Sequence, residues 1–177
     1  SGDASGNDNP LDVTVNAAKN ITATFAINQY AVNVSTIGSG SVARVPDQPL
    51  YDHGSSVQLT ATPAAGWHFV GWSGDASGTD NPLDVTVNVA KNITATFEID
   101  QYAVDVAVVG SGSVAKDPDQ PLYDVGSTVQ LTAMPAAGWH FVGWSGDVIS
   151  ASNPVNVTVD AAKNITATFA INQYAVN

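Results

Sequence analysis

The residues best suited to binding chemistry lie in an aromatic segment, residues 66–72 (GWHFVGW), which recurs unchanged at residues 138–144. The segment supplies all four tryptophans of the chain, which are Trp67, Trp72, Trp139 and Trp144. Exposed tryptophan rings could stack on a sugar and make the segment a glycan-binding surface. In a small module the same rings are also a main source of buried area, about 150–250 Å² each. We therefore favour a core role for the four tryptophans, with a ligand-facing role as the alternative.

The histidines of this segment belong to no evident catalytic set. His68 and His140 each follow a tryptophan and precede a phenylalanine, so on a strand they face away from both neighbours. A catalytic histidine requires a nucleophile and an orienting carboxylate, and neither can be assigned. The sequence GWSGD at residues 71–75 resembles a nucleophile elbow, but Asp75 replaces its second glycine. We expect no catalytic residues, no cofactor and no enzymatic activity.

A loop rich in oxygen-bearing side chains follows the aromatic segment. In residues 75–81 (DASGTDN), alternate side chains could meet Ca²⁺, which prefers six to eight oxygen ligands. The loop lacks the glutamate and the spacing of a known calcium loop, and its counterpart at residues 147–153 (DVISASN) loses most of the oxygens. We therefore favour an ordinary turn rich in Asp and Asn, with no bound metal.

The composition argues against two classes of partner. The chain has 177 residues, a formal net charge of −11 and only five basic residues. Such a chain repels phosphate backbones and anionic membranes. It also has no apolar run near the roughly 18 residues needed to cross a bilayer. We expect neither nucleic acid binding nor membrane insertion.

The chain is a tandem repeat with a period of 72 residues. The sequence SGDASG at residue 1 returns at residue 73, and a third SGD begins at residue 145. Between residues 1–72 and 73–144, 59 positions are identical. The modules are therefore near-identical copies, and adjacent repeats are the first expected partners of one another.

Alternating apolar and polar residues predict about six short antiparallel strands in each repeat. In the second full copy these lie near residues 102–108, 113–115, 129–133, 139–144, 157–159 and 165–169. Residues 160–164 are interpreted as a hairpin loop between the last two strands. Pro118 and Pro121 interrupt the one gap long enough for a helix. The predicted fold class is all-β, with tandem small β-sandwich or open-barrel modules.

A change of phase places the module boundary. Apolar residues are odd-numbered in residues 93–99 and even-numbered in residues 102–106. Because a shift of one residue moves every side chain to the other face, continuous pairing should end near Asp100 and Gln101. The predicted units are the end of one repeat at 1–26, complete repeats at 27–98 and 99–170, and the first strand of another repeat at 171–177. The connector contains no Gly or Pro, so we expect it to be short and stiff.

The incomplete units at the two ends predict self-association. Two strands alone are marginally stable. We therefore expect neighbouring chains or the adjacent module to complete residues 1–26 by strand donation, which exposed sheet edges invite.

The order of these elements resembles the divergent internalin B-repeat family, also called the Listeria-Bacteroides type. The features that carry the resemblance are the run Gly138-Trp-x-Phe-x-Gly-Trp-Ser-Gly-Asp147, the pair Asn153-Pro154 and the strand Ile165-Thr-Ala-Thr-Phe169. The resemblance implies extracellular modules in secreted or surface-anchored bacterial proteins, acting as stalks or adhesive segments without catalytic residues. Related internalin repeats have a β-grasp-like fold with a helix, which is the alternative fold here.

These observations together favour a structural function. We expect an extracellular spacer of tandem repeats, part of a large secreted or cell-surface protein, that can assemble into a filament by strand complementation. The alternative is an adhesive module that binds a glycan or a surface protein through the Trp-rich strand or the acidic loops.

Overall fold

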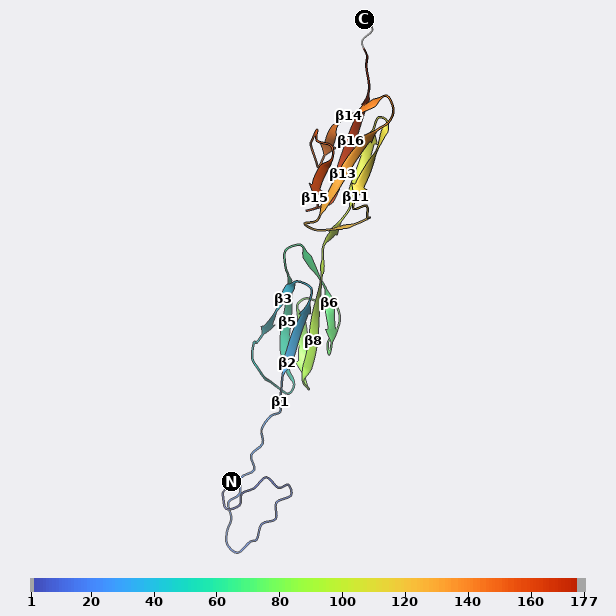
Figure 1. The fold of residues 1–177 in the computed structure, drawn as a ribbon. Helices are drawn as coiled ribbons and strands as arrows, with labels where there is room; N and C mark the ends of the chain where they lie inside the picture. The colour runs from blue at the N-terminus through green and yellow to red at the C-terminus, as the bar shows by residue number, and fades with distance from the viewer. Residues whose placement is uncertain (1, 175–177) are drawn as a thin grey trace.

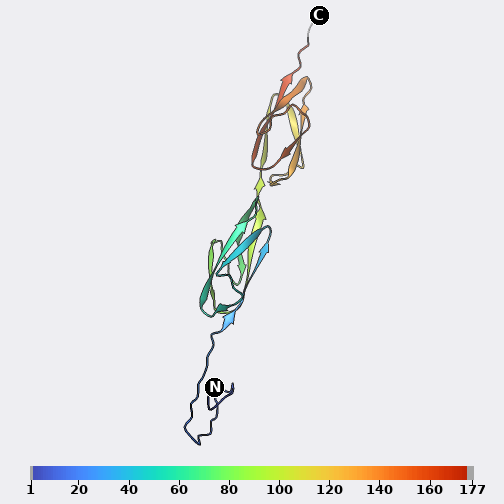
Figure 2. The same ribbon diagram turned by 90° about the vertical axis from the view of Figure 1, so that its left-hand side faces the viewer.

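The chain forms two modules that follow one another along one long axis. The computed structural model describes residues 2–174. Figures 1 and 2 show the modules end to end, with an N-terminal segment beyond the first and the C-terminal end beyond the second. Within the described residues there is no helix, and so none long and apolar enough to cross a membrane. The expected alternative, a β-grasp variant with a helix, therefore does not describe this fold.

Each module contains eight strands, two of which are only two residues long. The strands of the first module are β1 (Gln29–Tyr30), β2 (Val32–Ile37), β3 (Gly40–Val45), β4 (Tyr51–Asp52), β5 (Ser55–Pro63), β6 (Trp67–Gly74), β7 (Leu83–Val87) and β8 (Lys91–Ile99). Those of the second are β9 (Gln101–Tyr102), β10 (Val104–Val109), β11 (Gly112–Asp117), β12 (Tyr123–Asp124), β13 (Thr128–Pro135), β14 (Trp139–Gly146), β15 (Val155–Thr158) and β16 (Lys163–Ile171).

The strands of each module form two three-stranded sheets that enclose one core. In the first module the sheets have the orders β2-β8-β6 and β3-β5-β7, and the second module repeats them as β10-β16-β14 and β11-β13-β15. A smaller pair, β1 with β4 or β9 with β12, lies at the N-terminal end of each module. None of these sheets closes into a barrel. The all-β class and the tandem small modules are confirmed, and the sandwich replaces the open barrel.

The alternation in the central strands accounts for the core. Val57, Leu59 and Ala61 of β5 face Ile93 and Phe97 of β8 across the space between the sheets, and all five side chains are buried. Ala95, between Ile93 and Phe97, is buried with them, and the polar residues that alternate with these side chains lie on the opposite faces of the sheets, as the period of two requires. Gly40 completes the packing, because a Cβ atom there would lie 2.6 Å from the Phe97 ring.

Two predicted pairings need correction. Residues 160–164 are not a hairpin loop, because β15 and β16 belong to different sheets and the loop crosses between them. This crossing lets Val157 and Ile165 bury their side chains in the same core. In addition, β2 runs parallel to β8 and β10 runs parallel to β16. The long chain between the two partners makes a parallel pair feasible, since it allows the required crossover.

Residues 2–26 repeat the sequence of the β6–β8 region but have no sheet beside them. A bridge joins Gly2 to Ile21, and the Asp3 amide donates to the Asn20 carbonyl over 2.9 Å. Phe25 is 92% exposed, whereas its counterpart Phe97 is 2% exposed. Figure 1 shows this segment apart from the first module, so the adjacent module does not complete it. Of the predicted strand at 171–177, Ile171 ends β16, residues 172–174 form no strand, and residues 175–177 lie outside the described residues.

We expect Phe97→Ala to lower the free energy of unfolding of the first module by about 3–5 kcal/mol, because the ring fills the space between the two sheets. Chemical denaturation followed by tryptophan fluorescence measures this loss. Phe25→Ala is the matched control, since it lies in the same ITATF sequence, and it should change stability by less than about 0.5 kcal/mol. Equal losses in the two variants would contradict this description of the core.

Candidate functional site

Two of the four tryptophans are enclosed in the module cores. Trp72 is 4% exposed and Trp144 is 3% exposed. The indole N–H of Trp72 donates to the carbonyl of Asp80 over 2.8 Å, and that of Trp144 donates to the carbonyl of Ser152 over 2.9 Å. Each ring therefore joins the core to the loop that follows its own strand, and offers no face to a ligand.

The other two tryptophans lie at the border of the core. Trp67 and Trp139 are partly buried and pack against the core clusters of their modules. A Cβ atom at Gly38 would lie 2.9 Å from the Trp67 ring, and one at Gly110 would lie 2.9 Å from the Trp139 ring. Close packing against these turns covers part of each indole. Any surface left for a sugar is the remaining edge of Trp67 and Trp139.

The acidic loop forms an internal clamp. The Asp75 amide donates to the Asn92 carbonyl over 2.9 Å, and the Asn92 amide donates to Asp75 Oδ2 over 2.7 Å. This reciprocal pair ties the end of β6 to the start of β8, and Asp3–Asn20 and Asp147–Asn164 repeat it. In the described part of the chain, no group of three or more His, Cys, Asp or Glu residues is arranged to hold a metal ion.

The asparagine side chain of the same loop makes the hydrogen bonds that a neighbouring strand would make. The Asn81 side chain accepts from the Ala61 amide over 2.9 Å and donates to the Ala61 carbonyl over 2.8 Å. Asn153 makes the same two bonds with Ala133. In each repeat this asparagine therefore continues the pairing along β5 or β13, just before the partner strand, β7 or β15, begins.

The most specific polar arrangement is the joint between the modules, which is centred on Asp100. β8 ends at Ile99 and β9 begins at Gln101, so one residue separates the two modules. The Asp100 amide donates to the Gly66 carbonyl of the first module over 2.8 Å. Its carbonyl accepts from the Val125 amide of the second module, also over 2.8 Å. The connector is thus hydrogen-bonded to both modules through its own backbone.

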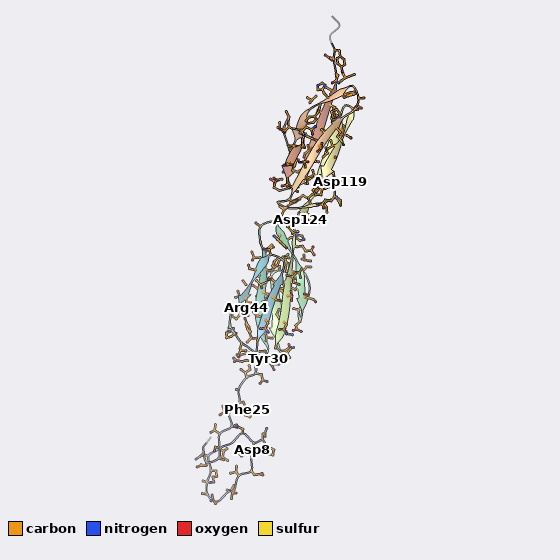
Figure 3. All side chains as sticks on the ribbon, in the orientation of Figure 1. Asp8, Phe25, Tyr30, Arg44, Asp119 and Asp124 are labelled. Carbon is orange, nitrogen blue, oxygen red and sulfur yellow. The ribbon has the colours of Figure 1, made fainter. Side chains whose placement is uncertain are left out.

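Side chains close the joint on two further sides. His68 Nδ1 lies 2.8 Å from Asp100 Oδ1, with the two side chains 53% and 30% exposed. Gly66 has φ +76°, and a Cβ atom there would approach Cγ1 of Val125 to 2.6 Å. A glycine is therefore required at position 66 both by its backbone conformation and by the valine of the next module. Figure 3 shows Asp124, next to this valine, at the end of the second module that meets the first.

The same bonds recur at the other ends of the modules. At the N-terminal end, the Asn28 carbonyl accepts from the His53 amide over 2.8 Å. At the C-terminal end, the Asn172 amide donates to the Gly138 carbonyl over 2.8 Å, and His140 lies 2.9 Å from Asn172 Oδ1. Residues 28, 100 and 172 are related by the repeat period. Each module therefore carries at its two ends the groups that form this joint.

The bonds of this joint are not evident from the sequence. The phase change marked Asp100 and Gln101 as the end of continuous pairing. The bonding partners Gly66, which begins the aromatic segment, and Val125 lie far from Asp100 in sequence, so the alternation around Asp100 does not indicate them. The signal that could have found them is the spacing, because Asp100 and Asn172 each follow a Gly-Trp pair by 34 residues, and Asn28 and Asp100 each precede a turn glycine by 26.

A family model described as the divergent InlB B-repeat domain matches residues 30–101 and again residues 102–173. The chain belongs to this family. The two matches together cover more than half of the chain and confirm the resemblance carried by the Gly-Trp and Asn-Pro motifs. No curated protein matches the chain. The two B-repeats meet between Gln101 and Tyr102, one residue after the connector.

For the acidic loop of the B-repeat, we expect Asp75→Ala to lower the free energy of unfolding by about 1 kcal/mol, because the Asn92 amide loses its acceptor. We also expect millimolar Ca²⁺ to leave the melting temperature of both proteins unchanged, since Asp75 is already engaged. Calorimetry with and without Ca²⁺ measures both effects. A rise in the melting temperature with Ca²⁺ that Asp75→Ala abolishes would show a calcium site instead.

Proposed function

We propose that the chain is a stiff spacer segment of a secreted or cell-surface protein, in which B-repeats follow one another as a rod. The joint at Asp100 carries the proposal, because this one connector residue is hydrogen-bonded to both modules. The membership in a family typical of bacterial surface proteins supports a location outside the cell. The function would then be mechanical: to hold another part of the protein at a fixed distance.

The physical case for stiffness is the shortness of the connector and the number of its restraints. A flexible linker needs several residues, commonly Gly and Ser, that are free to rotate. Here a single residue is restrained by two backbone hydrogen bonds and by the contact with His68. Each such bond contributes on the order of 1 kcal/mol. Bending the joint would break several of them together and expose the contact of Gly66 with Val125.

The proposal includes assembly with like chains. Residues 2–26 carry the apolar side chains that β7 and β8 bury in a complete module, among them Ile21 and Phe25. We propose that strands equivalent to residues 27–72, supplied by another repeat, complete the sandwich around these side chains. Repeated completion of this kind would extend the array into a filament.

The proposed role is non-enzymatic, without cofactor, nucleic acid or membrane insertion. This proposal is supported by the roles of the residues that could carry out chemistry, because their side chains stabilise the fold. Trp72 and Asp75 hold the core and the clamp, and His68 contacts the connector. The charge of −11 further disfavours anionic partners.

We expect X-ray scattering from arrays of two, four and six repeats to show a maximum dimension that grows linearly, by about 30 Å for each module. A Gly-Gly insertion after Asp100 should shorten the average dimension, because the connector can no longer bond to both modules at once. Asp100→Asn is the matched control, since Asn occupies the equivalent positions 28 and 172. Equal dimensions for the inserted and control proteins would contradict a stiff joint.

The alternative function, an adhesive module, depends on the exposed remainder of Trp67 and Trp139. If these edges bind a glycan, Trp67→Ala together with Trp139→Ala should abolish glycan-array binding while circular dichroism still reports folded sheets. We expect the opposite result: no glycan-array signal from the unsubstituted chain and a loss of stability in the double variant. A glycan signal that disappears without unfolding would favour adhesion.

A further inference from the structure

The two modules differ in sequence at the free edge of their mixed sheet. β2 and β10 are edge strands, each paired only with β8 or β16. The carbonyl of Ala103 accepts from the Lys163 amide over 3.0 Å, so the next backbone groups, those of Val104, point away from β16. By the same alternation, Val106 and Val108 also present their N–H and C=O groups at the open edge. Such an edge is a template for another strand.

In the first module an arginine side chain is hydrogen-bonded to this edge. Arg44 Nη1 donates to the carbonyl of Val32 over 2.9 Å, while Nη2 lies 2.7 Å from Asp47. The equivalent residue of the second module is Lys116, whose Nζ lies 3.5 Å from Asp119 and 6.0 Å from the centre of the Tyr123 ring. Among the described residues, no hydrogen bond joins Lys116 to Val104. The planar guanidinium can reach two acceptors in fixed directions, which a single ammonium group does less well.

The strand itself also changes between the copies. Four of the six residues differ between β2 (VNVSTI) and β10 (VDVAVV), whereas the eight residues of β6 and β14 are identical. Ser35 and Thr36 become Ala107 and Val108, so these two positions become apolar, whereas Asn33 becomes the charged Asp105. Ser35 contacts the Thr94 hydroxyl over 2.9 Å, and Ala107 cannot do so. Val108 and Val109 are both exposed.

We propose that β10 pairs antiparallel with β10 of a second copy of the chain. Centred on Val106, the pairing places Val104 opposite Val108 and Asp105 opposite Ala107. No like charges face each other, and each outward-facing pair can exchange two backbone hydrogen bonds. In the first module the carbonyl equivalent to that of Val104 is the carbonyl of Val32, which already accepts a hydrogen bond from Arg44. The same pairing between two β2 strands would need this carbonyl in both of its outer residue pairs. This pairing identifies one surface through which like chains could associate, as proposed above. Residues 2–26 take no part in it.

The orientation of the modules makes this a lateral contact. In Figure 1, β3 lies at the left side of the first module, whereas its counterpart β11 lies at the right side of the second. Figure 3 likewise shows Arg44 and Asp119 on opposite sides of the molecule. β3 and β11 directly follow the edge strands β2 and β10 in the chain, so the edge that Arg44 occupies and the edge of the second module face different directions. The charge of −11 on each chain opposes pairing, so the dimer should tighten as salt screens the charge.

Sedimentation of the 177-residue chain from micromolar to millimolar concentration tests the proposal. We expect a concentration-dependent dimer. Lys116→Arg should raise its Kd about tenfold, because the guanidinium takes the Val104 carbonyl. The reciprocal Arg44→Lys should open the edge of the first module and produce assemblies larger than dimers. Both substitutions keep the charge and occur naturally in the other copy, so the fold should persist.

Two further measurements separate this contact from association through the N-terminal segment. Phe25→Asp should leave the dimer unchanged, and hydrogen exchange at the amides of Val104, Val106 and Val108 should slow on dimerisation. A chain that stays monomeric at every concentration would overturn the proposal. So would a dimer that Phe25→Asp abolishes and Lys116→Arg leaves intact, and that result would instead support completion of residues 2–26 by another repeat.

Discussion

The hydrogen bonds of Asp100 to both modules are the constraint on which the arrangement of the chain depends. The Asp100 amide holds the turn at Gly66 and its carbonyl holds the turn at Val125, so the peptide units on either side of one residue belong to different modules. Because β8 leads directly into this residue, the central strand of one sandwich continues into the first strand of the next. The direction of the next module is therefore set by the sheet that precedes it. A repeat array built this way transmits its direction from module to module.

The residues that looked most reactive serve this arrangement. Trp72 closes its own loop through an indole hydrogen bond, and Asp75 joins the ends of β6 and β8. His68 contacts the connector. Each of these side chains has a polar group with a hydrogen-bond partner in its own module or in the connector. The motif Gly-Trp-Ser-Gly-Asp is thus explained by the closure of the sandwich around Trp72 and Asp75.

Local pattern predicted the strands and the boundary, but it could not predict pairings between distant segments. The alternation around Val57, Leu59 and Phe97 identified the buried face, and the phase change located Asp100. The same alternation is compatible with a hairpin or a crossing at residues 160–164, because both place Val157 and Ile165 toward an apolar interior. The choice depends on which sheet each strand joins, and that depends on the whole module. Other contacts also join segments that are separated in the chain. These are the bonds of Asp100 to Gly66 and Val125, and the hydrogen bond from Arg44 to Val32.

We infer that the two modules move as one body. Residual dipolar couplings, measured for both modules in one weakly aligned sample, test it most directly. A rigid joint predicts that the backbone couplings of residues 29–99 and 101–171 fit a single alignment tensor in the relative orientation seen here. Two tensors of clearly different magnitude would show independent motion about Asp100 and would contradict this account.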